Sequence, residues 1–293
     1  MSVAGGPPSI IDLDVGGGGG PRPVRRRRQR FTWRSLTVAA VSTVVFFGIL
    51  VAILTNAPGW ARFQESFLNS EYFWRALPKV IEAFWINVRL FLIAEVVILG
   101  LGLLLAVMRG LPGPVFFPVR LLATVYVDVF RALPGVLVIF MLGFGIPGLR
   151  IEGVPIDPFF WAIVALSLLY SAYVSEVYRA GIESVHPSQE AAARSLGLSR
   201  PQALRYVVLP QAVRRVIPPL LNDFIGLQKD TVLVSFIGVV EIFRTAQIEQ
   251  AANFNFTPYM AVALVFVVVT IPLARFTDWL VARDRARAAA GAR

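Results

Sequence analysis

The sequence predicts an all-α protein that crosses a membrane about six times. Of its 293 residues, 56% are hydrophobic and 16% are charged, whereas a soluble domain carries roughly a quarter charged residues. Residues 36–54 include no charged residue, and a helix needs ~20 apolar residues to cross a bilayer. Further apolar blocks, which lack an amphipathic stripe, lie at residues 90–107, 133–146, 159–174 and 259–273. A soluble core is therefore disfavoured.

The apolar blocks and the charges between them predict the topology. We expect spans at about residues 36–55, 83–108, 118–143, 159–180, 217–243 and 258–280, with the fifth broken. Cytoplasmic segments of membrane proteins carry an excess of Lys and Arg. Arginines are dense in residues 22–34, 179–215 and 283–293, whereas the opposite side carries few basic residues, mixed with glutamates. This asymmetry predicts a multi-pass membrane protein with both termini in the cytoplasm.

Several classes of function are excluded by residues that the sequence lacks. It contains no cysteine and a single histidine, His186. Disulfides, thiol catalysis and histidine or cysteine metal clusters are therefore ruled out, and we expect no catalytic residue and no metal site. The net charge of +10 could suggest nucleic acid, but the positions of the arginines indicate topology. We expect no nucleic-acid partner.

The longest cytoplasmic segment, residues 179–215, has the sequence of a folded unit. Pro187 and Ser188 precede residues 189–196, which are rich in helix-forming residues, and Gly197 stands where a glycine ends a helix. Two short helices joined at this glycine would form a rigid projection that fits a groove of another protein. On composition alone, an ordinary helical hairpin is the simpler interpretation.

A second short helix is expected directly after the glycine. Ser199 and Gln202 fit a capping box, and Pro201 is tolerated in a first helical turn. We expect this helix to end near Leu209 and Pro210.

Four motifs give the sequence a specific resemblance. Gly197, followed after nine residues by Val-Val-Leu-Pro at 207–210, resembles the EAA loop of permeases from bacterial ATP-binding-cassette (ABC) importers. Residues 172–182 (AYVSEVYRAGI), 130–134 (FRALP) and 227–231 (LQKDT) resemble its polar amino acid branch, the histidine/glutamine/arginine type. The motifs occur in the family's order within residues 80–280.

The resemblance implies a type I ABC importer permease fold in the bacterial inner membrane. The resemblance does not cover the first 79 residues. Five consecutive glycines from Gly16 predict a disordered Arg/Gly-rich cytoplasmic tail (1–34), which precedes an additional first helix with an extracytoplasmic loop (35–79). The permease domain (80–282) and a second cytoplasmic tail (283–293) follow. The ATPase-coupling loop would occupy about residues 186–212. Its expected contact residues are Gln189, Glu190, Ala191, Ala192, Ala193, Arg194, Gly197, Leu209 and Pro210.

One position departs from the family pattern. The family's glutamate lies six residues before the glycine, where this chain has Ala191, and Glu190 is one residue earlier. One residue turns an α-helix by about 100°, so Glu190 points elsewhere. Either the ATPase contact is rearranged, or it does without that charge; we favour the second interpretation.

The resemblance also implies the partners. These are a cytoplasmic ABC ATPase dimer that binds ATP and Mg²⁺, an extracytoplasmic solute-binding protein, a second permease subunit, membrane lipid and an amino acid substrate. The chain itself contains no phosphate-binding loop of the Gly-x-x-x-x-Gly-Lys-Ser/Thr type and is expected to hold no cofactor. We therefore expect a transport subunit that is not itself an enzyme.

Charged residues in or beside the spans are candidates for the substrate pathway: Glu176, Arg131, Lys229, Asp230 and Glu95. An ionisable group inside a membrane is costly unless it faces a partner or water. Glu176 could contact a cationic group of the solute or pair with Arg179, and the sequence favours neither. We expect a structural pair between Asp128 and Arg131. Glu95 could belong to the site or meet Arg89 or a neighbouring helix.

Other functions remain open at this point. The same machinery could carry another small polar solute, because the spans and the coupling loop are shared more widely than the substrate. A membrane-embedded enzyme would need a catalytic constellation that the sequence lacks. A non-transporting scaffold would not need an ATPase-docking projection.

Overall fold

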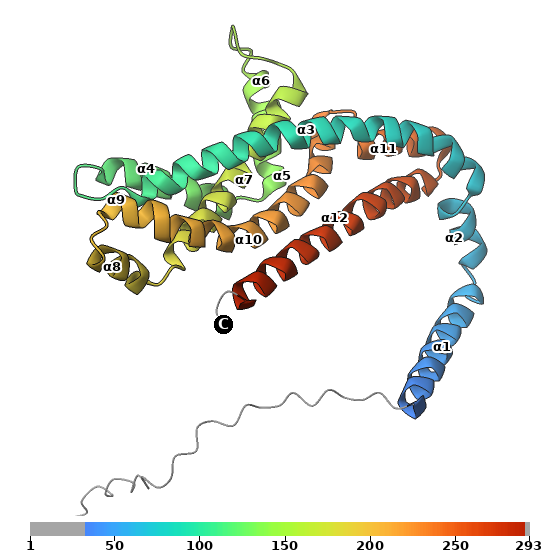
Figure 1. Cartoon of the computed structure of the whole chain (residues 1–293). Helices are drawn as coiled ribbons and strands as arrows, with labels where there is room; N and C mark the ends of the chain where they lie inside the picture. Colours follow the sequence, from blue (N-terminus) through green and yellow to red (C-terminus); the bar gives the residue numbers. More distant parts are fainter. Residues whose placement is uncertain (1–32, 291–293) are drawn as a thin grey trace, which may run out of the picture. The chain divides into compact units, whose positions relative to one another are not determined.

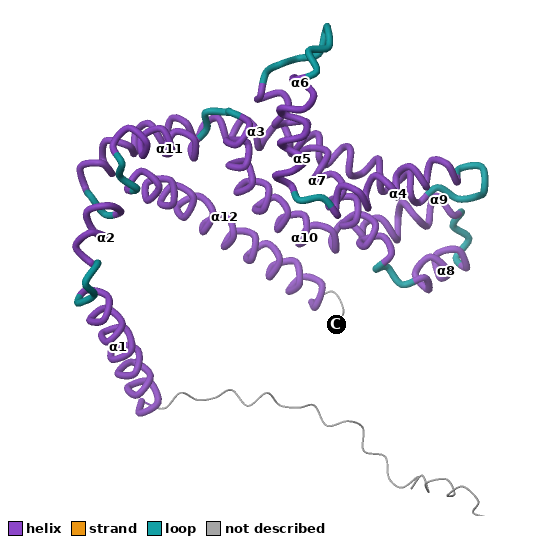
Figure 2. The backbone as a smooth tube through the Cα atoms, turned by 180° about the vertical axis from the view of Figure 1, so that it is seen from behind, coloured by secondary structure: helices purple, strands orange, loops and turns teal. Residues whose placement is uncertain are grey.

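The computed structural model describes residues 33–290, which are helical with no strand (Figures 1 and 2). The expected disorder of residues 1–34 lies, apart from its last two positions, outside the described residues. The described residues divide after Trp60 into two units. The first contains α1 (Trp33–Thr55), a 23-residue helix without an acidic residue. Its bounds match the first expected span.

The second unit is built around α3 (Ser70–Gly110), which begins well before the expected span. The side chain of Asn69 accepts hydrogen bonds from the backbone N–H groups of Glu71 and Tyr72, and this cap starts the helix at Ser70. Part of the expected extracytoplasmic loop is therefore helical. The short α2 (Trp60–Phe67) precedes it, and the Phe67 ring stacks on Phe256 with centroids 5.2 Å apart.

The core of this unit lies between α3 and α7 (Pro158–Glu183), which make the most extensive helix pair (Figure 1). Its fully buried residues include Leu90, Ala94 and Ile98 from α3 and Ala165 and Leu166 from α7. Gly102 brings the two backbones together, because a Cβ there would lie 2.7 Å from the Val174 side chain. Small residues at the contact are typical of helices that pack within a membrane.

The third expected span is not one continuous helix, so that prediction was wrong. Helix α4 (Phe117–Ala132) ends, and the helical segment Gly135–Gly148 continues at an angle of 106°. Leu133 precedes Pro134, and the proline ring disfavours the helical conformation for the residue before it; Leu133 accordingly has ψ 136°. The continuing segment consists of α5 (Gly135–Phe140), the π-helical turn η1 (Met141–Gly145) and α6 (Ile146–Gly148).

The break expected in the fifth span is confirmed. Helix α10 (Leu209–Asp230) continues as the 3₁₀ segment η3 (Thr231–Ile237), and α11 (Ile242–Asn253) follows at a bend of 50°. Gly238 has φ +93° at the break, a conformation that glycine adopts without steric cost. The sixth span is α12 (Thr257–Ala290), which extends through residues expected to be a tail.

The number of membrane spans agrees with the sequence. Within the described residues, four helices are long and apolar enough to cross a membrane, and there are six if each of the two bent pairs counts as one span. Three short elements between α7 and α10 complete the fold: α8 (Pro187–Ser195), α9 (Arg200–Ala203) and the π-helical turn η2 (Leu204–Val208).

Candidate functional site

The segment between α7 and α10 folds as the sequence indicates, into two short helices joined at Gly197. The ring nitrogen Nδ1 of His186 caps α8 by accepting from the Ser188 N–H at 3.2 Å. After α8, Gly197 has φ +88°, and the Leu198 N–H donates to the Ala193 carbonyl at 3.3 Å. This is a Schellman C-cap, and it confirms the conformation expected for Gly197. Gln202 accepts from the Ser199 N–H at 2.8 Å at the start of α9.

The second helix does not end at Leu209 and Pro210, contrary to expectation. The wide turn η2 leads directly into α10, which begins at Leu209. Pro210 lies in the first turn of α10, where the missing N–H is tolerated. The projection is therefore continuous with the fifth span.

The residues expected to contact an ATPase divide into exposed and buried ones. Gln189, Ala191, Ala192 and Arg194 are exposed, whereas Ala193 is buried. Leu196 at the end of α8 is 86% exposed. The projection thus presents small and apolar surface, with positive charge from arginine.

Glu190 forms an ion pair within the projection. Its carboxylate lies 3.6 Å from the Arg200 guanidinium of α9, and the neighbouring Ala191 has no charge to offer a partner. Glu190 therefore braces the two short helices against each other. Such a pair between exposed side chains contributes roughly 0.2–1 kcal/mol.

Near the C-terminal end of α7, which leads into the projection, Glu176 is surrounded by arginines. Its carboxylate lies 2.8 Å from Arg179 and 3.8 Å from Arg131, and it also pairs with Arg109 at the end of α3. The Glu176 side chain is 19% exposed. Three helices, α3, α4 and α7, are therefore joined by one carboxylate. The expected Asp128–Arg131 pair does not form, because Arg131 turns toward Glu176 instead.

Among the described residues, no hydrogen bond or ion pair joins the remaining pathway candidates Glu95, Lys229 and Asp230 to one another. Asp230 accepts a hydrogen bond of 2.7 Å from the Tyr170 hydroxyl of α7, and Lys229 beside it is exposed. Glu95 is partly buried in α3 and makes no ion pair with Arg89. Six residues turn a helix by about 240°, so these two side chains lie on different faces.

A buried polar network on α3 was not predicted from the sequence. Asn87 donates to the carboxylate of Glu241 at 2.9 Å and to the hydroxyl of Thr231 at 3.0 Å. Its side-chain oxygen accepts from the Ile242 N–H at 3.1 Å. Glu241, three residues after Gly238, was a sequence signal for the N-cap of a new helix. The signal was overlooked because the expected fifth span was extended to residue 243.

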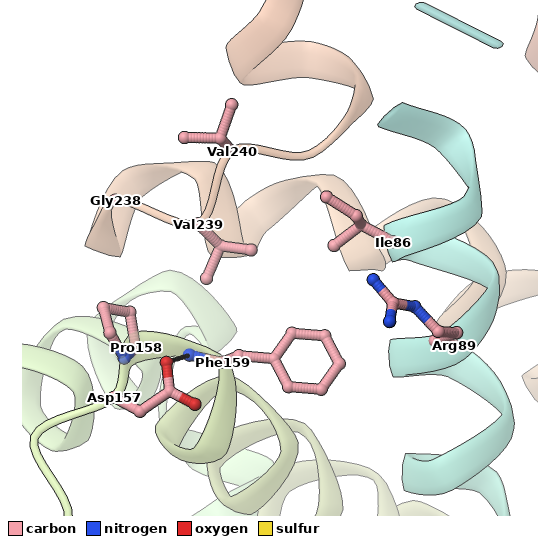
Figure 3. A pocket seen from close by; sticks show the side chains of 8 residues that line it. All are labelled: Ile86, Arg89, Asp157, Pro158, Phe159, Gly238, Val239 and Val240. Carbon is pink, nitrogen blue, oxygen red and sulfur yellow. Dashed lines mark hydrogen bonds between the residues drawn. The ribbon is translucent and has the colours of Figure 1, made fainter. Parts of the chain in front are cut away.

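A cavity of about 430 Å³ between α3, the start of α7 and the turn before α11 was likewise not predicted from the sequence. It is lined by Ile86, Arg89, Asp157, Pro158, Phe159, Gly238, Val239 and Val240 (Figure 3). Asp157 caps α7 by accepting from the Phe159 N–H at 3.1 Å. Within the described part of the chain, Arg89 has neither an ion pair nor a hydrogen bond, although it lies within a membrane span.

A family model agrees with this architecture. The model for the inner membrane component of binding-protein-dependent transport systems matches residues 98–285. A probable glutamine ABC transporter permease protein from Bacillus subtilis is 38% identical over 196 residues, which cover 64% of this chain and 87% of the relative. The glutamine transport system permease protein of Escherichia coli K12 is 37% identical, covering 68% of this chain and 90% of the relative.

Two solved structures are also similar. An amino acid ABC transporter crystallised with histidines has a TM-score of 0.65 and 32% sequence identity, covering 70% of this chain and 94% of that chain. An inward-facing methionine ABC transporter has a TM-score of 0.57 at 16% identity, over 70% of this chain and 95% of that chain, which shows a common fold.

Proposed function

The chain belongs to the family of binding-protein-dependent transport system inner membrane components, and from this membership we propose that it forms the pathway of a bacterial importer for polar amino acids. One observation carries the proposal. The projection of α8 and α9 is compact, capped at both helices and continuous with a membrane span. Such a projection can transmit movement from a partner protein into the membrane.

In this proposal the projection docks on a cytoplasmic ATPase dimer, which binds ATP and Mg²⁺ and performs the hydrolysis. A second permease subunit, identical or related, completes the pathway, and an extracytoplasmic binding protein delivers the solute. Closure of the ATPases would move the two projections together and turn the pathway outward, as rigid bodies.

The contacts of α10 support such transmission. Arg215 of α10 donates to the Ser184 carbonyl at the end of α7. Gly181 of α7 packs so tightly on α10 that an added Cβ would overlap the Val216 side chain. A displacement of η2 and α10 would therefore carry α7 with it, because close-packed helices move together.

The solute is proposed from the relatives, whose names include glutamine, arginine and glutamate transport. Glu95, Lys229 and Asp230 are the charged candidates for the pathway. We propose that Glu176 and Arg131 are structural residues at the arginine-rich end of the spans, where their charges pair, and that they do not contact the solute. Both termini are cytoplasmic in this proposal, because the arginine-rich segments fall on one side of the spans.

Reconstitution tests the proposed function. The complete importer, with its ATPase and binding protein in proteoliposomes, should accumulate at least one of L-glutamine, L-arginine, L-histidine and L-glutamate when ATP is supplied. Omitting the ATPase or the binding protein serves as the control and should abolish accumulation. If the importer accumulated maltose or phosphate but no amino acid, the proposed substrate class would be wrong. Uptake that does not depend on ATP would refute the mechanism.

A further inference from the structure

The cavity beside Arg89 has the size and the charges of a small-molecule site. Its volume of about 430 Å³ lies within the roughly 300–1,000 Å³ of such pockets. Figure 3 shows Arg89 of α3 and Asp157 at the start of α7 on opposite sides, with the ring of Phe159 between them. The walls therefore combine one cation, one anion and apolar surface.

Neither Arg89 nor Asp157 forms an ion pair within the described part of the protein. Arg89 has no ionic or hydrogen-bonding partner among the described residues, and Asp157 uses one carboxylate oxygen, Oδ1, for its cap. Both residues are exposed, so water hydrates them while the cavity is empty. Arg89 lies within a membrane span, where unpaired ionisable groups are rare and generally mark a ligand pathway, and Asp157 lies directly before one.

One wall of the cavity is a turn that hydrogen bonds hold against α3. Gly238, Val239 and Val240 form the turn between η3 and α11. Asn87, next to the cavity residue Ile86, bonds both Glu241 and the Ile242 N–H directly after that turn. The turn is thus fixed against the helix that carries Arg89, and a rigid wall lowers the entropic cost of binding.

We propose that this cavity binds the zwitterionic backbone of an α-amino acid, with Arg89 holding the α-carboxylate and Asp157 the α-ammonium group. The proposal rests on the proposed function and adds a binding site to it. A guanidinium binds a carboxylate through charge-assisted hydrogen bonds. The remaining oxygen of Asp157 is free to accept from an ammonium group. Because every α-amino acid shares these two groups, the site reads the backbone and leaves the side chain to other residues.

The position of the site in the membrane indicates at which stage of transport the amino acid would bind. Asp157 precedes α7 on the side opposite the projection, which the charge pattern makes extracytoplasmic. Glu176, near the other end of the same helix, is occupied by arginines. An amino acid released by a binding protein would therefore meet Arg89 and Asp157 early in its passage.

Direct binding tests the site without the binding protein. The permease–ATPase complex in nanodiscs is titrated with radiolabelled L-glutamine and, separately, L-arginine. Arg89→Gln and Asp157→Asn should each weaken binding of both probes at least tenfold. Asn still caps a helix, so Asp157→Asn removes the charge and keeps the start of α7. Arg75→Gln, which removes an exposed arginine of the same helix outside the cavity, is the matched control and should change binding less than twofold.

Blocked ligands identify which group each residue holds. Amidation of the α-carboxylate should weaken competition at least tenfold in the wild type but less than threefold in Arg89→Gln. N-acetylation should show the same pattern with Asp157→Asn. Arg89→Lys retains the charge and should recover part of the affinity, which separates a ligand contact from a folding defect.

The results distinguish the site from the proposed function. An importer that accumulates amino acids, while Arg89→Gln and Asp157→Asn bind both probes as the wild type does, would overturn the site and leave the function intact. Wild-type complex that transports L-glutamine but shows no saturable binding would also overturn it. A wild-type importer that carries no amino acid at all would refute the function itself.

Discussion

The side chains of Asn87 in α3 and Glu241 before α11 are hydrogen bonded to each other at 2.9 Å in the protein interior. Asn87 is 2% exposed and Glu241 is not exposed at all. Glu241 also accepts from the Phe243 and Arg244 N–H groups at the start of α11. One buried carboxylate therefore caps a helix and attaches the broken fifth span to the long helix of the second.

We expect Asn87→Leu to destabilise the protein by roughly 2–3 kcal/mol, because the Glu241 carboxylate and the Ile242 N–H would lose a buried partner. Thermal melting of the purified complex measures this. Lys79→Gln is the control, since Lys79 pairs with Glu249 between the same two helices but is 51% exposed. That change should cost less than about 1 kcal/mol. Equal effects of the two substitutions would contradict a role for the buried network.

We expect Glu176→Gln to lower the melting temperature before it lowers uptake per folded molecule. The substitution leaves Arg109 and Arg131 without a counter-charge and leaves Arg179 with Glu183 alone, at a cost of roughly 2–3 kcal/mol. The control Glu183→Gln removes an exposed partner of Arg179 and should change the melting temperature little. Unchanged melting with reduced uptake would instead make Glu176 a contact of the solute.

Gly102→Ala tests the packing of α3 on α7. The added Cβ would lie 2.7 Å from the Val174 side chain and 3.3 Å from the Ser171 carbonyl oxygen, so we expect a loss of roughly 1–3 kcal/mol. Gly100→Ala, two residues earlier on the same helix, meets nothing within 4 Å and should stabilise by roughly 0.5–1 kcal/mol. Melting temperatures that shift in the same direction would refute this packing.

Gly197→Val tests the coupling projection. The positive φ of Gly197 costs an L-residue roughly 1–2 kcal/mol, and a β-branched side chain adds to it, although the position has open space. We expect the protein to insert normally but to lose ATPase association and uptake, measured by co-purification and transport. Gly197→Asn is the control, because asparagine tolerates this conformation, and it should retain most activity. Normal transport by the valine variant would show that the projection is not used.

The orientation of the chain can be tested because it contains no cysteine. Single cysteines at Ser2 and Ala292, both outside the described residues, should resist an impermeant thiol reagent in intact cells and react after lysis. A cysteine at Ser66, before α3 on the opposite side, should react in intact cells. Labelling of Ser2→Cys alone would refute the retained first span, and labelling of both termini would invert the topology.

The sequence by itself determined the fold class, the family, the number of spans and the two-helix projection. The fold class, the spans and the projection depend on local or periodic patterns: apolar blocks of bilayer length, the distribution of arginine, and caps such as the one at Gly197. The family was identified from the resemblance of four short motifs. The break in the fifth span was also predictable. The kink before Pro134 had a local signal, since the residue before proline avoids the helical conformation, and the long apolar run obscured it.

The partners of the charged side chains were decided by the tertiary structure alone. Arg131 turns to Glu176 on another helix rather than to Asp128 on its own, and Glu241 meets Asn87 across 154 residues of sequence. The cavity between Arg89 and Asp157 likewise joins residues from separate helices. A hydrogen bond or an ion pair depends on distances of a few ångströms, and only the packing of one helix on another sets those distances.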